Sequence, residues 1–245
     1  MNWVYLSPHF DDAALSCGAM IWQQLDAGDS VQICTVCAGL PSTQVAFSPF
    51  AQSLHARWQT PPQIAVEQRR AEDENAGTVL GAVLRYWNLP DCIYRTLPDG
   101  SYLVNGEEDL YQPSHTHEAG VVTAMQEWLR VCLTPQSKLV VPMTLGGHVD
   151  HRLVRTAAEG LARPIYFYAD FPYVEKHPEA LPELIQPHWH KECIKLEETA
   201  VERWCDAIAC YTSQISTFWK DTAQMRIAMH GYAQSGGGAC LWFAE

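Results

Sequence analysis

Two short segments of the sequence concentrate histidine and aspartate. The first reads PHFDD at residues 8–12, and the second reads GGHVDH at residues 146–151. A loop that turns into a helix can direct an imidazole and a carboxylate three residues apart, such as His9 and Asp12, toward one point. The second segment offers two imidazoles for a third ligand. Two imidazoles and one carboxylate, with positions left open, are typical of a catalytic rather than a structural zinc site.

The same residues also have a simpler interpretation. Asp11, Asp12 and Asp150 could cap solvated helices, a common use of aspartate at a helix start. However, the two segments together hold six ionisable side chains. That would be a costly way to build a structural turn, because desolvated charges need partners. We therefore favour a metal site formed by both segments.

Alternating strand and helix patterns surround these segments. Apolar periodicity predicts strands over 3–6, 31–36, 84–87, 138–143 and 165–168. It predicts helices over 13–25, 67–84, 120–133, 151–161 and 192–210. This alternation indicates an α/β fold with an open, mostly parallel sheet and helices on both faces. Ligands bind such sheets at the carboxyl ends of the strands, and each His/Asp segment follows a predicted strand.

Length and charge limit the possible partners. The 245 residues show no linker composition, so we expect one domain over 1–245. The 28 acidic side chains outnumber the 16 basic ones, and the net charge of −12 argues against nucleic acid as a partner. The sequence shows no signal-like start and no apolar run of membrane-spanning length. We therefore expect a cytoplasmic protein without membrane insertion, and homo-oligomer formation stays open.

The nine cysteines are scattered and are predicted to be reduced, buried thiols. Cys34 and Cys37 have redox spacing, but they fall in or just after an apolar strand and are predicted to be core thiols, as is Cys17. The glycines at 236–238 lack the following Lys-Ser/Thr of a phosphate-binding loop and are predicted to form a flexible turn.

The motifs SPHFDDAALSCG at residues 7–18 and GGHVDH at 146–151 resemble those of the PIG-L (LmbE-like) N-acetylglucosaminyl deacetylase family. RRAED at 69–73, LPDCIYR at 89–95 and YTSQ at 211–214 are similar to further blocks of that family. The resemblance spans most of the chain. It implies a Rossmann-like sheet that holds zinc, or another divalent metal, and removes acetyl groups from N-acetylglucosamine-type sugar conjugates.

The resemblance also implies roles for individual residues. The metal ligands would be His9, Asp12 and His151, with Asp11 as general base and His148 as an assisting imidazole. The chemistry is consistent, since a metal polarises the amide carbonyl and lowers the pKa of bound water. Asp150 is expected to orient one of the imidazoles from outside the ligand set.

The sequence departs from the commonest family motif, AHPDDE, at two positions. Phe10 stands in place of the proline, and Ala13 stands in place of the glutamate. The three implied ligands are kept. The lost glutamate removes an acidic group just beyond the ligands, so metal tuning and substrate choice are expected to differ from those of better-known members.

Substrate contacts are predicted for three further residues. Arg70 and Asp91 are candidates to bind sugar hydroxyls or a phosphate, although Arg70 could equally belong to a solvated helix face. Tyr173 ends an aromatic segment and could stack on a sugar ring, whereas residues 166–168 are expected in a buried strand.

Two other function classes remain open. A non-haem iron oxygenase also uses two histidines and one carboxylate. Its familiar form is an antiparallel barrel with a His-x-Asp motif, which differs from the His-x-x-Asp spacing and alternating pattern here. A non-catalytic sugar-binding or nucleotide-binding protein is the other alternative, although the first loop lacks Gly-x-Gly-x-x-Gly.

Overall fold

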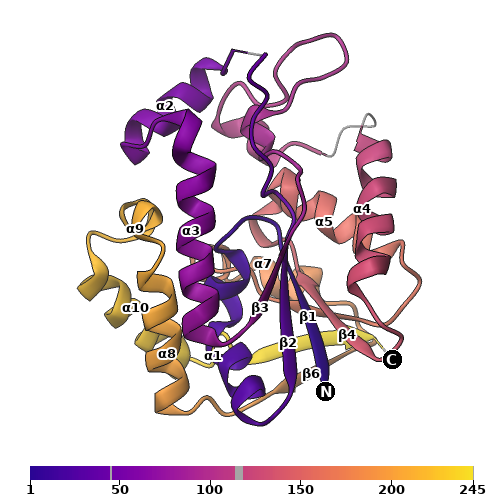
Figure 1. Cartoon of the computed structure of the whole chain (residues 1–245). Helices are drawn as coiled ribbons and strands as arrows, with labels where there is room; N and C mark the ends of the chain where they lie inside the picture. The colour runs from indigo at the N-terminus through magenta and orange to yellow at the C-terminus, as the bar shows by residue number, and fades with distance from the viewer. Residues whose placement is uncertain (45, 114–117, 245) are drawn as a thin grey trace.

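The fold is built on a seven-stranded sheet (Figure 1). The computed structural model describes residues 1–44, 46–113 and 118–244, with only the backbone at 62 and 63. The strand order is β3-β2-β1-β4-β5-β7-β6; the first five are parallel, and β7 runs antiparallel to both β5 and β6. The strands are β1 Asn2–Ser7, β2 Ser30–Thr35, β3 Val83–Tyr86, β4 Ser137–Pro142, β5 Ile165–Tyr168, β6 Trp189–Cys193 and β7 Cys240–Ala244.

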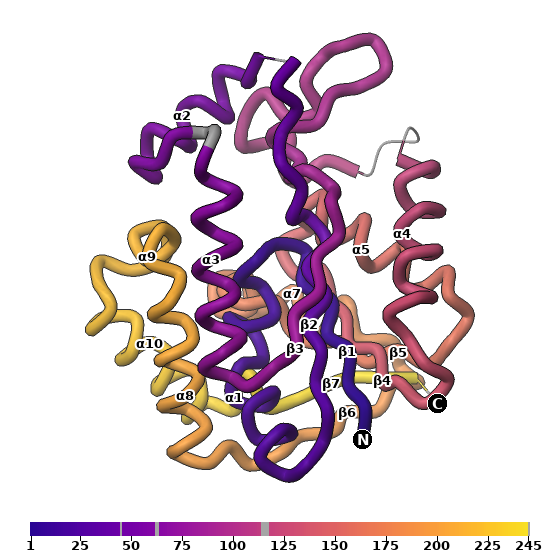
Figure 2. Tube along the Cα trace, viewed as in Figure 1, coloured from indigo at the N-terminus to yellow at the C-terminus, as the bar shows by residue number. Residues whose placement is uncertain are grey.

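Helices cover both faces of this sheet. Figure 2 shows α1, α3 and α8 together on one side of the sheet and α4 and α5 on the other. The helices are α1 Asp12–Asp26, α2 Pro49–Trp58, α3 Pro62–Leu80, α4 Ala119–Cys132, α5 Val149–Glu159, α6 Tyr173–Lys176, α7 Ala180–Leu184, α8 Glu198–Ala209, α9 Thr212–Phe218 and α10 Thr222–Gln234, with 3₁₀ turns η1 Cys92–Tyr94, η2 Glu107–Tyr111 and η4 Leu145–Gly147. The predicted α/β fold with a mostly parallel sheet is confirmed.

The alternation of side chains along β1 divides the core into two layers. Trp3 and Tyr5 pack in the cluster that includes residues of α1 and α3. Val4 and Leu6 point to the other face and pack with residues of α4 and α5. All four side chains are buried, as expected for a central strand of a sheet covered on both faces.

The chain reverses its direction of travel across the sheet between β1 and β4. From β1 it moves through β2 to β3 at one edge, and it returns to place β4 and then β5 on the other side of β1. Adjacent loops leave the sheet in opposite directions at such a switch point, which opens a crevice at the carboxyl ends of the strands. The loops after β1 and β4 carry the two His/Asp segments.

Several predicted element boundaries were wrong. The helix expected over 192–210 begins only at Glu198, because Glu192 and Cys193 pair with β7 as part of β6. The helix expected over 67–84 begins earlier, at Pro62, and ends at Leu80, where Gly81 adopts a left-handed conformation. The sequence patterns also missed α2, α9, α10, β6 and β7.

The prediction that all nine cysteines are reduced was also wrong. Cys193 and Cys240 stand directly opposite each other on the antiparallel strands β6 and β7 and form a disulfide. They are 47 residues apart in sequence, so only the strand register brings them together. Cys17, Cys34 and Cys37 are free and buried, which confirms the prediction for those three.

Residues 236–238 form the predicted turn between α10 and β7. Gly238 has φ +70°, and a Cβ there would meet the Trp204 ring at 2.5 Å, so this position requires glycine. Within the described residues, the helices are all too short or too polar to cross a membrane. The cytoplasmic location remains a prediction.

Candidate metal centre

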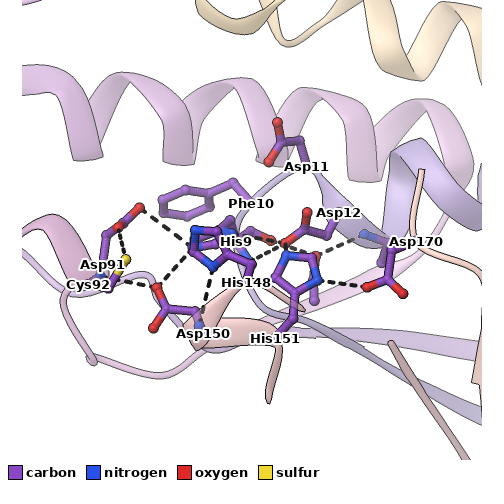
Figure 3. A network of polar contacts seen from close by, with 12 residues as sticks. His9, Phe10, Asp11, Asp12, Asp91, Cys92, His148, Asp150, His151 and Asp170 are labelled. Carbon is purple, nitrogen blue, oxygen red and sulfur yellow. Dashed lines mark hydrogen bonds and ion pairs between the residues drawn. The ribbon is translucent and has the colours of Figure 1, made fainter. Parts of the chain in front are cut away.

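Three side chains from the two His/Asp segments converge at the switch point (Figure 3). His9 lies in the loop after β1, Asp12 is the first residue of α1, and His151 lies in the first turn of α5. The Asp12 Oδ2 atom is 3.1 Å from His9 Nδ1 and 3.3 Å from His151 Nε2. One ligand atom of each residue lies within 4.8 Å of the others, so the three can hold a metal ion.

A second carboxylate contacts the outer nitrogen of each imidazole. His9 Nε2 lies 3.1 Å from Asp150 Oδ2, and His151 Nδ1 lies 2.7 Å from Asp170 Oδ1. An outer carboxylate that accepts the N–H of an imidazole leaves the other ring nitrogen free to bind a metal. Both imidazoles are therefore oriented with one nitrogen toward Asp12 and the other toward a carboxylate.

These outer carboxylates are themselves fixed. Asp150 Oδ2 accepts the backbone N–H of Cys92 at 3.1 Å, and Asp150 Oδ1 lies 2.7 Å from an Arg95 guanidinium nitrogen. Asp170 accepts the backbone N–H of Leu145 at 3.0 Å. Burial alone would raise the pKa of Asp150, but Arg95 and His9 hold it well below the usual value. Burial raises the pKa of Asp170 against the opposing effect of His151.

Asp170 is a site residue that the sequence reasoning missed. It follows the end of β5 by two residues, as His9 follows the end of β1. That location was the available signal. The surrounding aromatic residues, including Phe167 and Phe171, drew the interpretation toward a strand and a stacking surface instead.

We expect Asp170→Asn to weaken metal binding by about 10- to 100-fold, because an amide is a poorer acceptor for the His151 N–H than a carboxylate. Competition with a chromogenic chelator measures this affinity directly. The matched control is Asp29→Asn, at the opposite end of the sheet, where the carboxylate accepts the Trp3 indole N–H. Equal affinities of the two variants would show that Asp170 does not support His151.

Asp11 lies beside the ligands and lines the same cleft. Although Asp11 is at the N-cap position of α1, the described contacts of its side chain do not include a cap; its Oδ1 atom lies 3.1 Å from Arg69. Only 5% of its surface is exposed. Burial raises the pKa of Asp11, and the Arg69 guanidinium acts in the opposite direction. Helix capping therefore does not account for this residue.

His148 stands edge-on to His9, with ring centroids 5.0 Å apart, and lines the cleft. Its Nδ1 atom accepts the backbone N–H of Asp150 at 3.2 Å. Burial and the neighbouring His9 lower the pKa of His148 to about 4, so this imidazole is neutral around pH 7. With Nδ1 used as an acceptor, the single ring proton is on Nε2.

Of the three predicted substrate contacts, two line the cleft and one does not. Asp91 and Tyr173 both line the cleft; Asp91 Oδ2 lies 3.6 Å from His9 Nε2, and the Tyr173 ring is edge-on to His151. Arg70 does not line it. Its guanidinium donates to the Ala38 carbonyl at 2.6 Å and lies over the Tyr86 ring. The adjacent Arg69 lines the cleft instead, and substrate contact by Arg70 stays a prediction.

The blocks at 69–73 and 211–214 contact each other. The Tyr211 hydroxyl donates to Asp73 at 2.7 Å and is 3.1 Å from the Phe10 carbonyl. Glu72 accepts the hydroxyls of Thr212 and Ser213. The Glu72 bonds join α3 to α9, and the Tyr211 hydroxyl reaches the loop that carries His9. Both blocks therefore contact the segment that carries the first two metal-ligand candidates.

The buried Asp73 carboxyl should make the stability of the folded protein depend on pH. Burial raises its pKa from 3.8 to about 7, so the folded protein takes up a proton that the unfolded chain lacks between these values. Its contribution to stability is complete below pH 3.8 and is lost as the pH rises through 7. Asp73→Asn can still accept from Tyr211 and avoids the charge.

We therefore expect Asp73→Asn to be about 2–4 kcal/mol more stable than the wild type at pH 8 and nearly equal to it at pH 4. Urea unfolding at the two pH values measures the difference. If Asp73→Asn were destabilised equally at both pH values, the Asp73 carboxylate would act only as a hydrogen-bond acceptor.

The parallel sheet, its switch point and the His-Asp-His cluster define an α/β protein with a candidate metal centre between the two halves of the sheet. The chain belongs to the GlcNAc-PI de-N-acetylase (PIG-L) family, whose model matches residues 4–162. The predicted family is confirmed.

Similar proteins are deacetylases of sugar conjugates. The 2′-N-acetylparomamine deacetylase of Niallia circulans is 28% identical over 239 residues, which cover 91% of this chain and 84% of that protein. The zinc-inhibited form of teicoplanin deacetylase has 27% identity and a TM-score of 0.83, with 99% of this chain and 97% of that chain covered. A deacetylase–teicoplanin complex has 26% identity and a TM-score of 0.81, with 99% and 98% covered.

Proposed function

We propose that this protein is a zinc-dependent N-deacetylase that hydrolyses the acetamide of an N-acetylglucosamine-type sugar conjugate and releases acetate and the free amino sugar. The observation that carries the proposal is the His9, Asp12 and His151 cluster, with Asp11 and His148 beside it in one cleft. The relatives support it, because they are named as deacetylases of sugar-containing compounds. Their similarity to this protein covers nearly the whole chain.

The donor set fits the proposed ion. Two imidazoles and one carboxylate are a usual protein contribution to catalytic zinc, and another divalent metal could take the same ligands. The outer carboxylates Asp150 and Asp170 already orient both rings. When bound, the ion would supply Lewis acidity, which polarises the amide carbonyl and acidifies a water molecule.

Asp11 is the proposed general base. It lines the cleft beside the ligands, and its contact with Arg69 favours the ionised carboxylate, the form that can accept a proton from the attacking water. Its buried position keeps this carboxylate away from competing bulk water. Arg69 therefore acts as a positioning residue for the base.

His148 is proposed to stabilise the oxyanion that forms as the amide is attacked. Its Nδ1 atom is occupied by the Asp150 N–H, so Nε2–H is the group that remains to donate a hydrogen bond into the cleft. A neutral imidazole suits this role better than direct protonation of the leaving amine, and the proton that Asp11 accepts from the water would pass to the leaving nitrogen. Asp91 and Tyr173 are proposed to contact the sugar, because both line the cleft next to the ligand imidazoles.

The rival functions have less support. The open, mostly parallel sheet differs from the antiparallel barrel on which the two-histidine oxygenase arrangement is familiar. A protein that only binds sugars has no need of a buried carboxylate and a neutral imidazole beside a metal-ligand set.

Acetate release tests the proposal. Protein loaded with zinc should release acetate from one or more N-acetylglucosamine conjugates, and a chelator should abolish the reaction. Metal-free protein that gains no zinc on titration would contradict the proposal. So would consumption of oxygen and a ketoacid without acetate.

A further inference from the structure

The cleft extends well beyond the candidate metal centre. Its volume is about 460 Å³, which falls in the range of about 300–1,000 Å³ typical of sites for drug-sized ligands. The ionisable residues, among them His9, Asp12 and His151, form one part of its lining. The site therefore has room for more than the acetylated sugar ring, and the remaining lining must contact the rest of the conjugate.

Much of the remaining lining is apolar or aromatic. We call it the apolar wall, and it is formed mainly by Phe50, Leu54, Trp58, Leu110, Tyr111 and Phe218. Three of these residues come from α2, two from η2 and one from α9. Helices α2 and α9 contact each other, and all six side chains line the same cleft. Tyr111 is exposed, and the other five are half-buried, which leaves part of each available to a ligand.

The wall is held in place before any ligand binds. The Trp58 indole stands edge-on to the His55 ring, with centroids 5.3 Å apart, and the His55 ring is fixed by a 2.8 Å contact with the Tyr94 hydroxyl. Phe218 packs edge-on against Trp219, with centroids 5.5 Å apart. Rigid aromatic side chains contribute large contact areas at a small cost in conformational entropy.

The charges around the cleft do not favour a polycationic ligand. Away from the metal-ligand candidates and the adjacent Asp11, Arg69 and Asp91, the lining carries two cations, Arg57 and Lys176, and one carboxylate, Glu107. Asp11, which would attract an amine, already pairs with Arg69. The net charge of −12 attracts cations from a distance, but salt screens that field beyond about 8–10 Å. At contact distance, the apolar surface together with Arg57 and Lys176 decides which ligand the cleft accepts.

We propose that the apolar wall binds the aglycone of the conjugate, and that this aglycone presents an aromatic or branched apolar surface rather than a set of free amines. The inference rests on the proposed deacetylation, because the wall is continuous with the cleft that holds the candidate catalytic residues. Acetylated amino sugars on apolar aglycones should then be better substrates than small glycosides or N-acetylated aminoglycosides.

Three probes test the inference: 4-nitrophenyl N-acetylglucosaminide, methyl N-acetylglucosaminide and 2′-N-acetylparomamine. In the zinc-loaded wild type, kcat/KM for the aryl glycoside should exceed that for the other two by about 10-fold or more. Trp58→Ala and Phe218→Ala should each lower the aryl-to-methyl ratio by about 10-fold. Trp128→Ala is the matched control, since Trp128 is half-buried against Trp87 and lies outside the cleft lining. Its ratio should equal that of the wild type.

Calorimetric titration with the two glycosides separates this inference from the proposed function. Tighter binding of the aryl glycoside that is lost in Trp58→Ala, without acetate release from any probe, would refute deacetylation and leave the wall assignment standing. Acetate release with equal kcat/KM for the aryl and methyl glycosides would overturn the wall assignment. Preference for 2′-N-acetylparomamine would overturn it as well and would assign the cleft to cationic aglycones.

Discussion

Replacement of Asp11 by asparagine should lower turnover by about 10²- to 10⁴-fold while the protein folds and retains its metal. The magnitude is that of general-base catalysis by a positioned side chain. Asparagine keeps the size of the side chain and can accept a hydrogen bond from Arg69, but it cannot take up the proton of the attacking water. Because Asp11 is outside the ligand cluster, metal affinity should change far less than turnover.

Acetate release measured on zinc-loaded protein, together with metal content, checks this prediction. Asp29→Asn provides the same chemical change at the opposite end of the sheet and should keep wild-type turnover. The competing interpretation is that Asp11 only supports the start of α1, which would cost about 0.5–2 kcal/mol of stability and spare the chemistry. Near-normal turnover of zinc-loaded Asp11→Asn would therefore eliminate Asp11 as the base.

The second large effect concerns the ligands. Asp12→Ala and His151→Ala should each weaken metal binding by well over the about 10- to 100-fold that is typical of residues outside the ligand set. Each removes one of the three proposed ligands, and the remaining two should not compensate. Metal content after dialysis against a weak chelator, followed by a titration with zinc, measures the loss.

His148→Ala makes this test discriminating. His9 could also form a ligand group with His148 and Asp150, whose atoms lie close enough together. In our assignment, His148→Ala keeps most of its metal affinity, whereas His151→Ala loses it. The reverse result would assign the ion to the second group and return His151 to a supporting role.

The clustering of His9, Asp12 and His151 could be predicted because its signals are local. Each His/Asp segment follows an apolar strand, and parallel strands bring their carboxyl ends to the same edge of the sheet. Asp170 obeys the same rule, but a single aspartate among aromatic residues carries no spacing pattern. The choice between Arg69 and Arg70 depends on helix phase. Neighbouring residues point about 100° apart, and the apolar periodicity that predicts the helix does not show which of the two faces the cleft.

The elements that were missed depend on tertiary contacts. In α9, Gln214 and Ile215 are buried, and Glu72, which lies far away in sequence, contacts its first turn. The strand β6 has one half-buried residue and four exposed ones, so it lacks the apolar signal of a strand and is defined by its pairing with β7. The apolar wall is likewise assembled from α2, η2 and α9, and no single sequence window contains all three.

The switch point has a further consequence for how the protein loses its activity. His9 and Asp12 belong to the β1–α1 half of the sheet, and His151 belongs to the β4–α5 half. A local opening of either half separates the ligands, even where the other half keeps its native hydrogen exchange protection. Metal release should therefore report the first sub-global unfolding event rather than complete denaturation. A proteolytic fragment that contains only one half should retain secondary structure more readily than it retains the centre.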